Sequence, residues 1–152
     1  MNTKILVSII LSVAHVTFAE DPGRFEIHAI SGVPSASTTE QWLPGRDGTS
    51  EKIFVDSTVL LGPDSLRSAE VAFDRKGHPC INIDLTDAGS KKLAAITADN
   101  VNKRLGFIIA GKLRMAPVVR EPITGGKLQI TGTFTPEEAA EIVDMVRGKE
   151  PQ

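Results

Sequence analysis

The stretch IDLTDAGSKKLAAITADNVNKRLGFIIAGKLRMAPVVREPITGGKLQITGTFTPEEAA (residues 83–140) decides the fold of this 152-residue chain. Thr86 can cap a helix over 87–101, because a threonine hydroxyl accepts a hydrogen bond from a first-turn backbone N–H. The run Thr135-Pro136-Glu137-Glu138 predicts a second helix, with Thr135 as cap, proline at the first helical position and Glu138 completing a capping box.

Between these helix starts, the chain reads as strands and turns. We expect a hairpin of 104–110 and 112–119 that pivots at Gly111, then a Gly125-Gly126 turn and a strand over 127–132. Pro117 donates no hydrogen bond, so it predicts a sheet edge or a bulge. Apolar positions of the first helix predict its buried stripe, which comprises Ala88, Leu93, Ile96 and Val101. Gly89 weakens that helix by up to about 1 kcal/mol and would let a strand approach closely.

The amino-terminal half has weaker signals. Alternation predicts a strand over 25–30, and Ser31–Ser50 reads as a long loop whose Trp42-Leu43 pair tucks back onto the core. A functional lid is the alternative interpretation of that loop. The run 52–61 reads as β-structure, in one strand or in two broken near Asp56-Ser57.

A hairpin of 70–74 and 80–85 is expected next in the chain. The second strand alternates apolar Ile81, Ile83 and Leu85 with polar neighbours, which suits one buried and one wet face of an antiparallel sheet. The element order predicts an α+β fold, a largely antiparallel sheet of about five to seven strands with two helices packed on one face.

Residues 1–19 carry one lysine, an apolar run over 5–18 and small residues before Glu20, which is typical of a secretory signal peptide cleaved after Ala19. An uncleaved membrane anchor is the alternative, although 14 interrupted residues fall short of the about 20 that span a bilayer. We therefore expect one exported domain over 20–152, periplasmic or extracellular, with no later membrane span.

Without residues 1–19 the chain holds 16 basic against 19 acidic residues, which argues against a nucleic-acid partner. Tyrosine is absent and tryptophan occurs once, so a surface rich in aromatic anchors is not expected. The basic residues of one hairpin form a candidate surface for an acidic partner, with a solvated face as the plainer interpretation. They are Lys103, Arg104, Lys112, Arg114 and Arg120.

We find no catalytic, metal or cofactor constellation. His28 and His78 are too few for a zinc site, which needs three or four ligands. Cys80 and His78 form a conceivable thiol–base pair, but a partly covered strand thiol is the plainer interpretation. Gly125-Gly126-Lys127 fails the phosphate-loop pattern, because Glu121 stands where a glycine is needed.

The same stretch resembles the P1 head subdomain of SecD, a periplasmic part of the bacterial protein-export translocase, firmly over 83–140. The resemblance is carried by Leu85, Gly89, Thr97, Asn100, Arg104-Leu105, Ile108 to Lys112, Ala116-Pro117, Pro122-Ile123, Gly125-Gly126, Ile130, Gly132, Phe134-Thr135 and Glu138-Ala139.

This resemblance implies contact with emerging polypeptide rather than motor activity, because SecD's membrane spans and its base subdomain have no counterpart here. The family's Asp-Gly hairpin tip is Ala110-Gly111, which makes a type I′ turn less expected, since alanine tolerates a positive φ poorly. The family's serine before Ala-Pro is Met115.

The sequence thus predicts a non-enzymatic module outside the cytoplasm that binds polypeptide or an envelope protein, as a possible accessory to protein export. A periplasmic small-ligand or sensory module is the alternative, with the 31–50 loop closing over a pocket.

Overall fold

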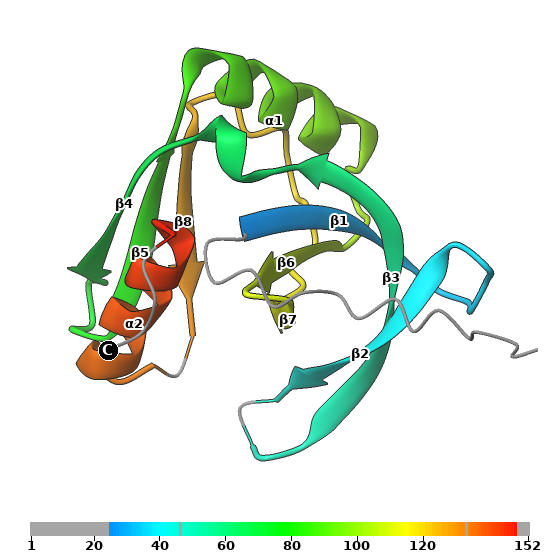
Figure 1. The fold of residues 1–152 in the computed structure, drawn as a ribbon, viewed down its shortest axis with the longest axis horizontal. Helices are drawn as coiled ribbons and strands as arrows, with labels where there is room; N and C mark the ends of the chain where they lie inside the picture. The colour runs from blue at the N-terminus through cyan, green and yellow to red at the C-terminus, as the bar shows by residue number, and fades with distance from the viewer. Residues whose placement is uncertain (1–24, 46, 133, 149–152) are drawn as a thin grey trace, which may run out of the picture.

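The α+β class is confirmed by a computed structural model, which describes residues 25–45, 47–132 and 134–148 (Figure 1). Its strands are β1 (Phe25–Ser31), β2 (Thr38–Pro44), β3 (Ser50–Leu61), β4 (Leu66–Phe73), β5 (Pro79–Leu85), β6 (Leu105–Ile109), β7 (Lys112–Met115) and β8 (Lys127–Thr131). The helices are α1 (Asp87–Asp99) and α2 (Pro136–Val146), with a 3-10 turn, η1 (Pro63–Ser65), before β4. The predicted signal segment, 1–19, lies outside the described residues.

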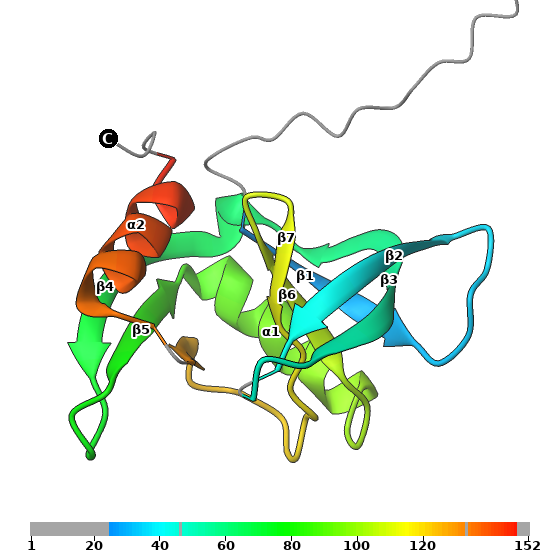
Figure 2. The same ribbon diagram turned by 90° about the horizontal axis from the view of Figure 1, so that it is seen from below.

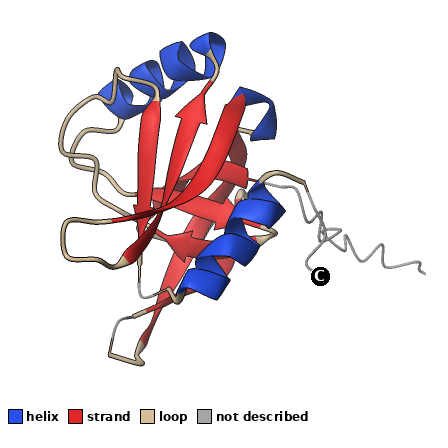
Figure 3. Cartoon of the chain, turned by 90° about the vertical axis from the view of Figure 1, so that its left-hand side faces the viewer, coloured by secondary structure: helices blue, strands red, loops and turns tan. Residues whose placement is uncertain are grey.

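The strands form two antiparallel sheets where the sequence suggested one. The first has the order β2-β3-β1-β6-β7 and the second the order β4-β5-β8. The division falls at η1, where the chain turns after β3 and starts a new sheet with β4 (Figures 1 and 2). Both helices contribute to one main core with the apolar face of β5, because Leu93 of α1 and Ile142 of α2 belong to the same cluster as Ile81 and Ile83. Figure 3 shows both helices beside the strands.

The five-stranded sheet curls, so that its two edge strands approach each other. Gln41 Nε2 of β2 donates to the carbonyl oxygen of Gly111, which follows β6 (3.5 Å). A second, smaller core fills the inside of the curl, with Ile53, Val55, Ile108 and Leu113 buried there. The sheet therefore buries both of its faces, one against the main core and one against itself.

The expected loop over 31–50 is wrong, because β2 occupies 38–44 and pairs with β3 at every residue. A segment held by such a ladder is no lid, so the lid interpretation falls with the loop. Leu43 packs against the small core as expected, but Trp42 is 56% exposed and lies against Lys52, whose Nζ is 5.4 Å from the ring centre. β3 is one strand of 12 residues, and its pairing with β1 has register shifts rather than a break at Asp56-Ser57.

Helix α1 is anchored at its start to η1. Thr86 caps the helix as predicted, accepting from the Gly89 N–H at 3.1 Å, and its own N–H donates to the Ser65 carbonyl oxygen at 2.9 Å. A Cβ on Gly89 would lie 2.5 Å from that same oxygen. The close approach predicted at Gly89 is thus real, but its partner is η1 rather than a strand. Leu93 is buried as expected, while Ala88 is exposed.

Helix α1 also holds the loop that leads to β8. Thr97 is fully buried, and its hydroxyl donates to the Leu93 carbonyl oxygen (2.8 Å) and accepts from the Ile123 N–H (2.9 Å). Gly126, with φ 65°, passes so close to Ser90 that a Cβ would lie 2.0 Å from its hydroxyl oxygen. These contacts fix where β8 begins. The Asn100 side chain caps the end of the helix by donating to the Ile96 carbonyl oxygen (2.8 Å).

Replacing Gly89 with alanine should lower the free energy of unfolding by about 1–3 kcal/mol, since the added methyl must push α1 off η1. Gly125→Ala is the matched control, because a Cβ there meets nothing within 4 Å, and it should change stability by less than about 0.5 kcal/mol. Urea denaturation followed by circular dichroism measures both. Equal effects from the two substitutions would contradict the packing assigned to Gly89.

The tip of the β6–β7 hairpin differs from the sequence-based expectation, which disfavoured a type I′ turn at Ala110-Gly111. Ala110 has φ 50° and Gly111 has φ 75°, between the paired residues Ile109 and Lys112. Positive φ at both central residues defines a type I′ turn, whose twist matches the flanking strands. The alanine is therefore held in a conformation that costs roughly 1–2 kcal/mol, and pairing of the strands imposes it.

Ala110→Asn should raise the free energy of unfolding by about 0.5–1 kcal/mol, because asparagine adopts positive φ more readily. Ala110→Val should lower it, since a β-branched side chain is strained there. Thermal denaturation of the two variants and of the native protein measures their order of stability. A valine variant as stable as the asparagine variant would rule out the positive-φ turn.

Candidate functional site

A groove of about 750 Å³ lies between the two sheets, walled by α2 on one side and by the end of β7 on the other. Its lining mixes apolar side chains with three charged ones. The lining residues are Leu43, Pro44, Gly45, Arg114, Met115, Ala116, Pro117, Thr131, Gly132, Phe134, Glu138, Glu141, Ile142 and Met145.

The groove lies where the last strands of the two sheets end. β7 ends the order of the five-stranded sheet and β8 ends that of the three-stranded sheet. Pro117 follows β7 as the edge signal predicted, and a single bridge between Arg104 and Val118 continues the pairing. Strand β8 pairs with β5 along one side, from Lys127 to Thr131. Its other side is the outer edge of the sheet.

One wall of the groove is formed by a single face of α2. Glu138, Glu141, Ile142 and Met145 are spaced i, i+3, i+4 and i+7, which places them on one face of a helix. The neighbouring stripe, with Ala139 and Val143, is buried in the main core. The predicted capping box is confirmed: Glu138 accepts from the Thr135 N–H (2.8 Å), and the Thr135 hydroxyl accepts from the Glu138 N–H (3.1 Å).

The opposite wall carries Arg114, which occupies a β-bulge. Ile108 pairs with Leu113 and Phe107 with Met115, so one step along β6 matches two along β7 and Arg114 is the extra residue. Bulges of this kind redirect a side chain from the regular alternation. Arg114 Nε is buried and has no hydrogen-bond partner among the described residues. A buried donor without an acceptor is costly, by about 1–3 kcal/mol.

The basic residues singled out from the sequence occupy different environments. Arg104 is tied down, its Nε donating to the Ala116 carbonyl oxygen (2.8 Å) and its guanidinium pairing with Glu51 (2.8 Å). Lys103 donates to the Asp99 carbonyl oxygen (3.4 Å). Lys112 and Arg120 are exposed and do not line the groove, whereas Arg114 does. The role of these residues as one surface stays a prediction.

The Cys80–His78 pair is poorly arranged for nucleophilic chemistry. Cys80 is fully buried rather than partly covered, and burial, reinforced by the charge of Asp74, raises the pKa of its thiol. His78 is exposed in the turn before β5, with its ring Nδ1 3.2 Å from Asp74 Oδ2. That carboxylate accepts from the His78 and Lys76 N–H groups, and the His78 bond is the largest cause that lowers the pKa of Asp74.

The Cys80 thiol should therefore be unreactive in the folded protein. With a disulfide reagent such as DTNB at pH 8, we expect reaction about a hundredfold or more slower than in 6 M guanidinium chloride, because both burial and the raised pKa suppress the thiolate. Cys80 is the chain's one cysteine, so the signal is unambiguous. Labelling of the native protein at the rate of free cysteine would contradict the structure.

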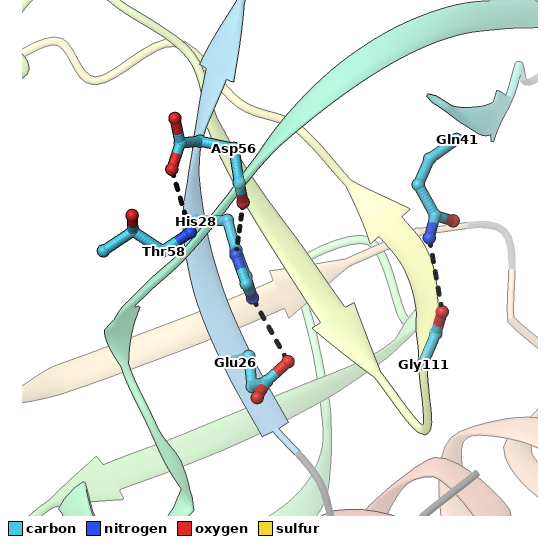
Figure 4. A network of polar contacts seen from close by, with 6 residues as sticks. All are labelled: Glu26, His28, Gln41, Asp56, Thr58 and Gly111. Carbon is cyan, nitrogen blue, oxygen red and sulfur yellow. Dashed lines mark hydrogen bonds and ion pairs between the residues drawn. The ribbon is translucent and has the colours of Figure 1, made fainter. Parts of the chain in front are cut away.

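A buried polar network inside the curled sheet was missed by sequence reasoning (Figure 4). Glu26 and His28 of β1 are both buried, with His28 Nε2 3.1 Å from Glu26 Oε2 and His28 Nδ1 2.7 Å from the Asp56 carbonyl oxygen. A carbonyl only accepts, so Nδ1 carries a proton, and the Nε2–Oε2 bond needs one more. The i, i+2 spacing of Glu26 and His28 on one strand was the available signal.

The Glu26–His28 network does not make a metal site with its neighbours. No group of three or more histidine, cysteine, aspartate or glutamate side chains is placed to hold a metal ion within the described ranges. In the same part of the chain, none of the helices has the length and apolarity to cross a membrane. The groove is therefore the candidate functional site.

The chain belongs to the SecDF P1 head subdomain family, whose model matches residues 39–149. It is 35% identical over 118 residues to the protein translocase subunit SecD of Acidaminococcus fermentans, covering 76% of this chain and 28% of that protein. It is 43% identical over 96 residues to SecD of Calditerrivibrio nitroreducens, covering 62% and 18%. SecDF of Thermus thermophilus is 39% identical over 92 residues, covering 57% and 12%.

Solved structures agree with this family. A crystal structure of SecDF in a super-membrane-facing form matches with a TM-score of 0.67 and 25% identity, over 86% of this chain and 19% of that one. A second structure, of SecDF described as a membrane component that enhances protein export, shares the fold with a TM-score of 0.68, over 86% and 64%. The chain spans less than a third of the length of the curated relatives described above.

Proposed function

We propose that this protein is a non-enzymatic binding module of the bacterial cell envelope that holds extended polypeptide during protein export. Family membership supports the setting, because the relatives are translocase subunits and one related structure is described as enhancing protein export. Residues 1–19 would direct the chain out of the cytoplasm as a signal peptide. The groove supplies the binding surface.

The observation that carries the proposal is the open edge of β8 beside the groove. An extended peptide can add to such an edge as a further strand, with main-chain hydrogen bonds giving affinity independent of sequence. A module that binds many secretory proteins requires that independence. Alternate side chains of the added strand would then point into the groove and away from it.

The groove lining suits the inward side chains. Met115, Phe134, Ile142 and Met145 offer apolar contacts, and methionine adapts to partners of different shape because its chain is unbranched and polarizable. Thr131 belongs both to this groove and to a second depression, of about 680 Å³, beyond the end of β8. A bound segment would continue from the groove into this depression.

Titration of fluorescein-labelled 12-residue peptides tests the proposal by fluorescence anisotropy. A peptide of alternating leucine and serine should bind with a Kd in the micromolar range. The same peptide with alternate backbone nitrogens methylated should bind at least about tenfold more weakly, because it cannot pair with β8. Equal binding of both peptides would refute strand addition, and absence of saturable binding would refute polypeptide binding itself.

A further inference from the structure

The two walls of the groove carry opposite charges, and this bears on which polypeptides it accepts. Glu138 and Glu141 lie on the α2 wall together with the apolar Ile142 and Met145, and Arg114 lies on the β7 wall. We propose that the groove selects extended apolar segments that contain a basic residue, whose cationic group lies against the α2 carboxylates. The inference rests on the proposed function and names its substrate class.

The acidic wall is available to a ligand because of its place on the helix. Glu141 is exposed and lies one turn after Glu138, on the groove side of α2. Glu138 also completes the capping box with Thr135, so its carboxylate is held in place at the start of the helix. A lysine or arginine side chain has an apolar stem and a cationic end. Its stem would cover the part-exposed Met145, and its cationic end would reach the carboxylates.

Arg114 would contribute to peptide binding in a different way from the two carboxylates. Its Nε is buried and without an acceptor among the described residues, and its bulge position takes it out of the ladder of β7. A peptide carbonyl would accept from the terminal N–H groups of the Arg114 guanidinium, whatever the sequence of the peptide. Arg114 would thus act on affinity, whereas the two carboxylates act on choice of sequence. An acidic ligand side chain at that position would face the two like charges of the α2 wall.

Three peptides that differ at one central position test this: alternating leucine and serine with arginine, glutamine or glutamate in the middle. For the native protein we expect the arginine peptide to bind about tenfold more tightly than the glutamate peptide at 50 mM salt, with a smaller ratio at 500 mM. Equal dissociation constants would overturn the inference while leaving polypeptide binding intact. Absence of binding by all three peptides would overturn both.

Glu141→Gln should reduce the arginine-over-glutamate preference at least about threefold. Glu137→Gln is the matched control, because it removes the same charge one helix turn earlier from a residue that does not line the groove, and it should leave the preference unchanged. Arg114→Gln should weaken all three peptides by a similar factor, with the melting temperature measured in parallel to confirm folding. If Glu137→Gln reduced the preference as much as Glu141→Gln, the preference would arise from the overall negative charge of α2. That result would contradict a direct contact between the ligand and the groove side of the helix.

Discussion

The contact between the first turn of α1 and the carbonyl oxygen of Ser65 is the constraint on which the rest of the structure depends. Ser65 ends η1, the point at which the chain passes from the curled sheet to the three-stranded one. Thr86 donates to that oxygen, and Gly89 leaves room for it. Because the other end of α1 binds the loop before β8 through Thr97 and Ile123, one helix sets both the junction of the sheets and the position of β8.

The groove follows from this placement. β7 and β8 are the last strands of two separate sheets, and residues at their ends line the groove. Exposed edges invite unwanted pairing, and proteins blunt them with proline, lysine and bulges. Pro117, Lys127 and the bulge at Arg114 are devices of this kind. They disfavour edge-to-edge pairing with other copies of the chain.

Much of the architecture could be predicted from local signals. The caps at Thr86 and Thr135, the glycine turns and the edge at Pro117 depend on neighbouring residues, so the sequence is enough to locate them. Strand β2 was missed because it lies within 31–50, where glycine, proline, serine and threonine are abundant and indicate a loop, and pairing with β3 overrides that signal. The turn at Ala110 was misjudged because tertiary pairing overrode the preference of alanine.

The candidate site was beyond local signals. The groove joins Leu43, Arg114, Thr131 and Glu141, which the fold alone brings together. Of these four, Arg114 alone was predicted as an interaction residue, as part of a basic hairpin rather than as a bulge residue, while Leu43 was expected to pack on the core.

Amide hydrogen exchange, followed by NMR with and without a saturating alternating leucine–serine peptide, tests the central claim most directly. Strand addition at the groove predicts slower exchange at alternate amides of β8, from Lys127 to Thr131, with β4 at the other edge of the same sheet unchanged. Protection at β4 instead, or a bound peptide that leaves the β8 amides exchanging as before, would contradict the account.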